Sequence, residues 1–232
     1  MLSLLTIIPA KGSGEGAARS FYAVPIIGLI EGSVVGGLGF ALRQEPLLAA
    51  SVMLLAHIII TGAMHLDGTA DYGDVLGSRR RGGEALDVLK DPRRGAFGVT
   101  AVVAVLLTKL SALYYLASHP LLIVASYVIG LEGAYIAALL GKAEPYEGMA
   151  RPIVGAVRTS RSIVANIAVT GLILGFLSAL NVKALLELIG LTASIIVALD
   201  SDRRLGFVNG DVLGLSIEST EALALLVTAA CG

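Results

Sequence analysis

Long, nearly uninterrupted runs of apolar residues dominate the chain and predict its secondary structure. Each run is close to the roughly 20 residues that a helix needs to cross about 30 Å of hydrocarbon. The least regular runs are the sixth, which is short and carries Glu187, and the last, which carries Glu218 and Glu221. We predict an all-α, polytopic integral membrane bundle of about seven transmembrane helices, forming a single domain over residues 1–232. The runs lie near 21–42, 46–64, 97–117, 120–141, 162–181, 183–199 and 212–231.

Composition supports a membrane protein over a soluble domain. The chain is 56% hydrophobic and 15% charged, with 28 glycines and a mean hydropathy of +0.84. A net charge of −1 gives no bulk attraction for nucleic acid. The single cysteine, Cys231, excludes an internal disulfide and a cysteine metal cluster.

Basic residues gather on one side of the predicted membrane. With seven crossings, only Arg43 and Lys183 fall on the opposite side, while Lys109 falls inside a helix. Because Lys and Arg are concentrated in cytoplasmic loops, we predict a cell-membrane protein with a cytoplasmic N-terminus and a cytoplasmic segment 65–98. The residues on the basic side are Lys11, Arg19, Arg79, Arg80, Arg81, Lys90, Arg93, Arg94, Lys142, Arg151, Arg158, Arg161, Arg203 and Arg204.

Residues 65–98 form a polar island that holds five aspartates, one glutamate, five arginines and a lysine. No proline separates the second apolar run from this segment, which predicts one helix continuing out of the membrane. At 100° per residue, Asp71 then lies about 40° and Asp74 about 20° from Asp67, so the three carboxylates share a face. Such like charges repel, and a divalent cation relieves the repulsion. We predict that Asp67, Asp71 and Asp74 bind Mg²⁺, and that the adjoining His65 is catalytic.

A basic, glycine-containing segment precedes the third crossing. Backbone N–H groups at a helix start and the guanidinium groups of Arg93 and Arg94 are expected to cradle phosphate. Together with the carboxylates, they indicate Mg²⁺-dependent chemistry on a phosphorylated substrate at the membrane surface.

Ionisable residues inside the predicted helices are costly and indicate paired or functional groups. Lys109 and Glu132 are expected to pair, since they lie on adjacent crossings. Asp211 and Glu218, seven residues apart, share a helix face that predicts a wet cavity. A cation transporter using such carboxylates is an alternative, although the densest carboxylates lie at one surface and not at the midplane.

Three motif regions resemble the cobalamin synthase family, the integral-membrane adenosylcobinamide-GDP ribazoletransferases of the last step of vitamin B12 assembly. The resemblance spans nearly the whole chain, but Leu131-Glu132 stands where the family usually has a glycine-arginine pair. The matching residues are His65-Leu66-Asp67-Gly68 with Ala70-Asp71, Leu89-Lys90-Asp91 with Gly95-Ala96-Phe97-Gly98, and Gly210-Asp211-Val212-Leu213-Gly214 with Glu218 and Glu221.

The resemblance implies a reaction in which a ribose hydroxyl of α-ribazole, or of its 5′-phosphate, attacks the phosphoryl group attached to cobinamide and releases GMP. In this reaction Asp91 is expected to be a further metal ligand or the base. Lys90, Arg93 and Arg94 would hold the diphosphate, and Asp211 and Glu218 would close the substrate site. The chain is also similar in its chemistry to the CDP-alcohol phosphatidyltransferases, which makes phosphotransfer to or from a lipid the alternative function.

Overall fold

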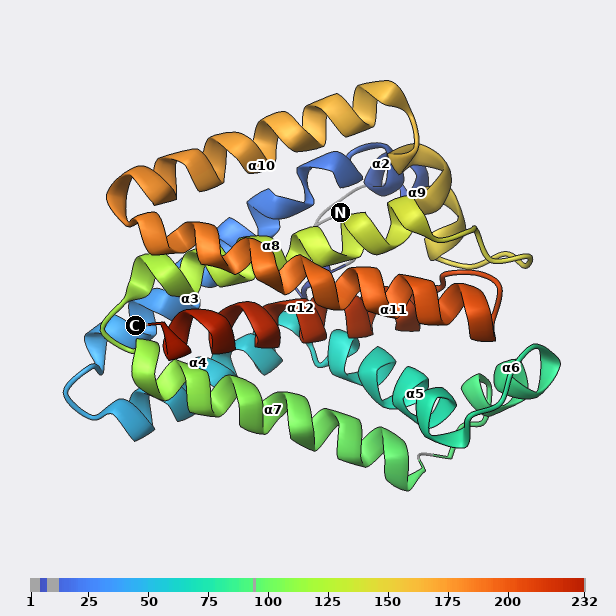
Figure 1. Cartoon of the computed structure of the whole chain (residues 1–232), viewed down its shortest axis with the longest axis horizontal. Helices are drawn as coiled ribbons and strands as arrows, with labels where there is room; N and C mark the ends of the chain where they lie inside the picture. Colours follow the sequence, from blue (N-terminus) through green and yellow to red (C-terminus); the bar gives the residue numbers. More distant parts are fainter. Residues whose placement is uncertain (1–4, 8–12, 94, 232) are drawn as a thin grey trace.

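The computed structural model describes residues 5–7, 13–93 and 95–231, and this part of the chain is helical with no strand. Figure 1 shows the helices packed into one elongated bundle. The helices are α2 (Gly14–Arg19), η1 (Phe21–Ala23), α3 (Val24–Ala41), α4 (Pro46–Thr61), α5 (Met64–Ser78), α6 (Gly83–Leu89), α7 (Ala96–Leu116), α8 (Pro120–Leu140), α9 (Ala150–Val157), α10 (Ser160–Leu180), η2 (Val182–Gly190), α11 (Leu191–Arg204) and α12 (Gly210–Ala230).

Local chemistry explains where several helices begin. Pro46 and Pro120 stand in the first turns of α4 and α8, where a missing backbone N–H costs nothing. The side chain of Thr159 accepts a hydrogen bond from Ser162 N and caps α10. Asn209 caps α12 in the same way, through Val212 N.

Six helical segments in the described chain are long and apolar enough to cross a membrane, and the bent pair α4 and α5 makes a seventh if it is one broken span. This confirms the predicted all-α polytopic membrane bundle. The six are Phe21–Ala41, Ala96–Leu116, Pro120–Leu140, Ser160–Leu180, Val182–Arg204 and Gly210–Ala230.

The prediction that the second crossing continues as one helix into residues 65–74 is wrong. Helices α4 and α5 meet at an angle of 88°. Gly62 and Ala63 between them have positive φ values of 60° and 58°. Gly62 adopts this left-handed conformation at no steric cost and ends α4, so the chain turns sharply before the aspartates. The aspartates still share one helix, because Met64–Ser78 is continuous.

The helices differ strongly in how much of their surface the bundle covers. Helix α8 lies at the centre, and 89% of its most apolar stretch is buried inside the bundle. The buried share of the corresponding stretch is 22% in α7 and 17% in α10. Their exposed apolar faces suit a lipid surrounding.

Two apolar clusters fill the bundle, and a layer of buried charged groups separates them. In α3, Glu31 lies between Ile27 of one cluster and Val35 of the other. In α12, Glu218 lies between Ile217 and Leu225 in the same manner. The charged layer therefore crosses several helices at one depth.

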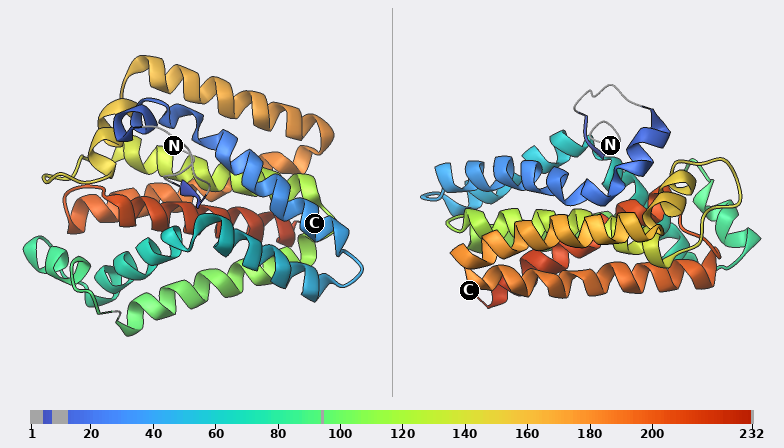
Figure 2. Two further views of the ribbon diagram at one scale, coloured as in Figure 1. Left: turned by 180° about the vertical axis from the view of Figure 1, so that it is seen from behind. Right: turned by 90° about the horizontal axis from the view of Figure 1, so that it is seen from above.

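The short helices α2, α6 and α9 gather at one end of the bundle, together with the loop that precedes α9 (Figures 1 and 2). The chain reaches this end after α5, α8 and α11, and leaves it at the starts of α7, α10 and α12. Most of the basic residues therefore lie at this end, which we call the basic end.

Candidate active site

The polar island and the start of the last helix, far apart in sequence, are in contact at the basic end. Helix α5 packs against α12 through a glycine on each side. A Cβ added at Gly68 would lie 2.9 Å from Asp211 Cα, and one added at Gly214 would lie 3.1 Å from His65 O. Because glycine has no Cβ, the backbones of α5 and α12 can lie this close together at both positions. The glycines thus bring the His65–Asp67 segment beside Asp211.

A cavity of about 210 Å³ lies where these two helices meet. His65, Asp67 and Asp211 line its polar part, and residues from α8, η1 and α9 add an apolar wall. His65 is only 5% exposed, and neither of its ring nitrogens has a hydrogen-bond partner in the described chain. A buried imidazole without a partner is costly, and it is ready to bind a ligand that enters the cavity.

The three aspartates of α5 have different surroundings. Asp67 is exposed and lines the cavity, while Asp71 and Asp74 are half-buried. The Asp74 carboxylate accepts hydrogen bonds from Gly95 N at 2.6 Å and Gly98 N at 2.8 Å. It therefore caps the start of α7, a role that helix periodicity could not indicate. Within the described residues, no three His, Cys, Asp or Glu side chains converge closely enough to hold a metal ion.

The expected phosphate cradle at the start of α7 is only partly available. The N–H groups of Gly95 and Gly98 are already bound to a carboxylate, so they do not face a substrate phosphate. Arg93 remains exposed, and Arg94 lies outside the described residues. Two of the backbone donors of the predicted cradle are therefore occupied, and the role of the arginines stays a prediction.

Asp91 and Arg93 form a closed pair in the loop before α7. The Arg93 backbone and guanidinium donate to the Asp91 carboxylate at 2.8–3.0 Å. These hydrogen bonds lower the pKa of Asp91 from 3.8 to about 2. An ionised carboxylate of low pKa is a weak proton acceptor, so this geometry favours a ligand role for Asp91 over the role of base.

Lys90 is connected to the start of α12 through aromatic side chains. Its Nζ lies 5.1 Å from the centre of the Tyr146 ring, and that ring packs edge-on against Phe207 at 5.6 Å. Asn209, two residues later, donates to Asp211 Oδ2 at 2.7 Å. Tyr146, in the loop before α9, thus lies between Lys90 and the segment that leads to Asp211.

Glu218 lies behind His65, inside the charged layer, and does not line the cavity. It accepts a hydrogen bond from Lys109 Nζ at 2.5 Å, and its other oxygen lies 3.1 Å from His57 Nε2 and 3.9 Å from His65 Nδ1. On its other side, His57 contacts Glu31 at 2.8 Å. This position relates Glu218 to the cavity only through His65.

The expected pair between Lys109 and Glu132 does not form. Lys109 contacts Glu218 and, at 3.0 Å, Glu221. Glu132 instead accepts hydrogen bonds from Asn166 and Thr170 of α10. Burial of an ionisable group in a membrane span was the signal that both residues are paired, but only the tertiary structure identifies the partners.

Comparisons with known proteins cover nearly the whole chain. Residues 1–229 match the family model described as Cobalamin-5-phosphate synthase. The chain is 35% identical to the adenosylcobinamide-GDP ribazoletransferase of Brevibacillus brevis, over 97% of this chain and 94% of that protein. The enzyme of the same name from Chlorobium chlorochromatii is 34% identical, over 99% and 93%. No solved structure gives a significant match. By the extent of these matches, the chain belongs to the cobalamin-5-phosphate synthase family.

Proposed function

We propose that the chain transfers the cobinamide-phosphate group of adenosylcobinamide-GDP to α-ribazole or its 5′-phosphate and releases GMP. A ribose hydroxyl of the acceptor forms a new P–O bond to the phosphoryl group attached to cobinamide. The P–O bond to GMP breaks, and GMP carries away the electron pair. The observation that supports this proposal is the cavity that His65, Asp67 and Asp211 line together, since residues of the first and the last of the three motif regions meet there.

The donor set of α5 fits a Mg²⁺ ion that is shared with substrate phosphates. Mg²⁺ is usually held by one or two carboxylates plus phosphate oxygens and water, so three converging protein ligands are not required. Asp67 and Asp71, one helical turn apart, would hold the ion, with Asp211 opposite. When bound, the ion would neutralise charge on the diphosphate. Asp74 keeps its role as the cap of α7.

His65 is the protein group that we assign to the attacking hydroxyl. Its buried imidazole lines the cavity beside Asp67, and its ring nitrogens have no hydrogen-bond partner in the described chain. One ring nitrogen would accept a hydrogen bond from the attacking hydroxyl group and then its proton. The Glu218 carboxylate lies behind the ring, 3.9 Å from Nδ1, at a distance too long for a hydrogen bond. Lys90 and Arg93 supply positive charge at the same end of the bundle, where the diphosphate would lie.

The basic end would face the cytoplasm, because the excess of Lys and Arg lies there. This orientation places the site where a soluble nucleoside acceptor can reach it, while the exposed apolar faces of α7 and α10 contact the lipid bilayer of the cell membrane.

The test is turnover by the purified protein in proteoliposomes. With adenosylcobinamide-GDP, α-ribazole and Mg²⁺, we expect GMP release matched one-to-one by a cobalamin product, and none when either substrate is omitted. Chelation of Mg²⁺ should stop the release, and added Mg²⁺ should restore it. Absence of GMP release, or turnover of CDP-diacylglycerol in its place, would reject the proposal.

A further inference from the structure

We propose that the cavity between α5, α9 and α12 is the subsite for the base of the acceptor, the dimethylbenzimidazole ring system of α-ribazole. The inference rests on the proposed function and extends it, because it assigns the acceptor to one cavity and the specificity for its base to named side chains.

The size of the cavity selects a small fragment. At about 210 Å³ it is smaller than the roughly 300–1,000 Å³ typical of pockets that enclose drug-sized ligands. A corrinoid nucleotide cannot enter it, so the donor must lie outside, against the open basic end. A single fused bicyclic base is of the right scale.

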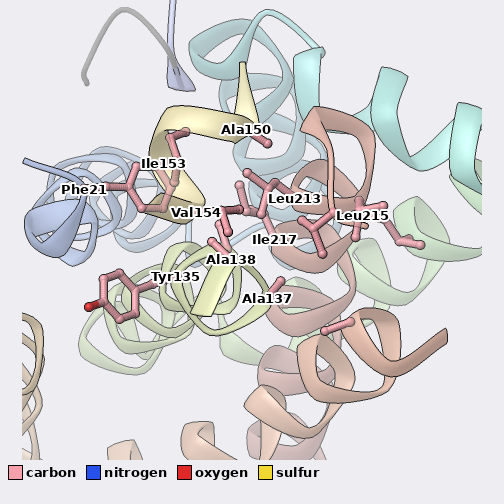
Figure 3. Packing of buried hydrophobic residues seen from close by; sticks show 14 of the residues in the cluster. Phe21, Tyr135, Ala137, Ala138, Ala150, Ile153, Val154, Leu213, Leu215 and Ile217 are labelled. Carbon is pink, nitrogen blue, oxygen red and sulfur yellow. The ribbon is translucent and has the colours of Figure 1, made fainter. Parts of the chain in front are cut away.

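The apolar lining of the cavity consists of a buried wall and two more exposed methionines. Phe21, Ile153 and Ile217 are almost fully buried and form an apolar wall, and Figure 3 shows Phe21 and Ile153 directed toward one another from η1 and α9. Met64 and Met149 line the cavity as well, and both are exposed by about half, at 41% and 59%.

This lining matches an apolar aromatic base better than the other ring systems present in the reaction. Methionine sulfur and phenylalanine rings make favourable contacts with aromatic groups. Guanine carries donors and acceptors on most of its edges, and the apolar wall would leave these groups unpaired. A benzimidazole with two methyl groups has few polar atoms and gains from the same wall.

The orientation follows from the polar part of the cavity. With the base against Phe21 and Ile153, the ribose that is attached to it lies toward His65 and Asp67. The hydroxyl is then beside the imidazole whose two ring nitrogens have no hydrogen-bond partner among the described residues. One placement therefore accounts for both the apolar wall and a histidine that lacks a hydrogen bond in the described chain.

The experiment measures acceptor binding and turnover separately. Equilibrium dialysis with α-ribazole alone, on the full chain in lipid nanodiscs, gives the Kd of the acceptor. The same measurement with the riboside of unmethylated benzimidazole tests the wall. Burial of each methyl group strengthens binding about fourfold, so we expect the Kd of the riboside that lacks both methyl groups to be roughly fifteenfold higher.

Two variants alter the wall without touching a polar group. Met149→Ala removes an exposed loop side chain and should weaken α-ribazole binding severalfold, while the KM for adenosylcobinamide-GDP stays unchanged. Ala134→Met places a larger side chain of α8 in the cavity and should weaken α-ribazole binding more than Met149→Ala does. In both variants the preference for the methylated base should shrink. Leu140→Ala, which truncates an exposed apolar residue elsewhere on α8, is the matched control and should change neither constant.

Equal Kd values for the methylated and unmethylated ribosides would overturn the inference, as would α-ribazole binding that both wall variants leave intact. Even if Ala134→Met fails to fold, Met149→Ala and the two ribosides still decide the question. Failure of the proposed function is a different result, because it consists of acceptor binding without GMP release when both substrates are present.

Discussion

Lys109 supplies an ammonium group to the buried charged layer. The substitution Lys109→Met removes this charge and keeps much of the side-chain volume. The Nζ atom lies 2.5 Å from Glu218 and 3.0 Å from Glu221, and all three side chains are 0% exposed. Without the lysine, the two buried carboxylates lose the ammonium group that they share, and His57 is left as the nearest nitrogen contact of Glu218, at 3.1 Å.

Two estimates of the cost can be compared. If the contacts behaved as ordinary interhelical hydrogen bonds in a membrane protein, the loss would average about 0.6 kcal/mol and reach about 1.7. Removing one partner of a desolvated ion pair costs about 3–5 kcal/mol, because an uncompensated charge stays buried. Complete burial of all three groups selects the larger value. With roughly 2–4 °C per kcal/mol for a chain of this size, Tm should fall by roughly 6–20 °C.

The assay is thermal unfolding of the variants in one detergent at fixed concentration, read by the loss of α-helical circular dichroism. Glu218→Gln alone should also destabilise the protein, but the double variant should lose less than the sum of the single variants, since the removed charges compensate each other. Leu107→Ala, an exposed position on α7, is the control for substitution in this helix. A loss below about 1 kcal/mol for Lys109→Met, or strict additivity with Glu218→Gln, would refute the assignment of a buried charged layer that Lys109 and Glu218 stabilise together.

Further predictions concern the site itself. Asp67→Asn and Asp71→Asn should each abolish GMP release while membrane insertion and Tm are unchanged; retained activity at saturating Mg²⁺ would count against a metal role. Asp74→Ala should lower stability by about 1–3 kcal/mol, since two backbone N–H groups at the start of α7 lose their acceptor, and an unchanged Tm would contradict the capping role. Gly68→Ala should impair activity more than an exposed substitution, because its Cβ would lie 2.9 Å from the α12 backbone; wild-type rates would show that the helices can separate freely. The pKa of Asp91 is about 2, so this group stays ionised between about pH 5 and pH 8, and Asp91→Asn should change the rate by the same factor throughout that range; a factor that varies with pH would indicate that Asp91 titrates there.

The polar island illustrates how far the sequence determined the site. Aspartates at spacings of four and seven residues in an apolar chain predict a common helix face, and α5 contains all three. The same spacing could not distinguish Asp67, which lines the cavity, from Asp74, which caps α7. That difference depends on Gly95 and Gly98, which only the packing of α7 brings to Asp74.

The charged layer and the cavity show the opposite case. Each buried charge was visible in the sequence as a costly group in an apolar run, but its partner comes from a helix tens of residues away. Lys109 was therefore assigned to Glu132 when it binds Glu218 and Glu221.

The length and hydrophobicity of the apolar runs determined the helical membrane fold from the sequence alone, because each segment's transfer from water to lipid depends on its own residues. The position of His65 and Asp67 in one cavity with Asp211 was decided only by tertiary structure. It requires the bend at Gly62 and Ala63 and the close approach at Gly68 and Gly214, and no local pattern encodes the two together.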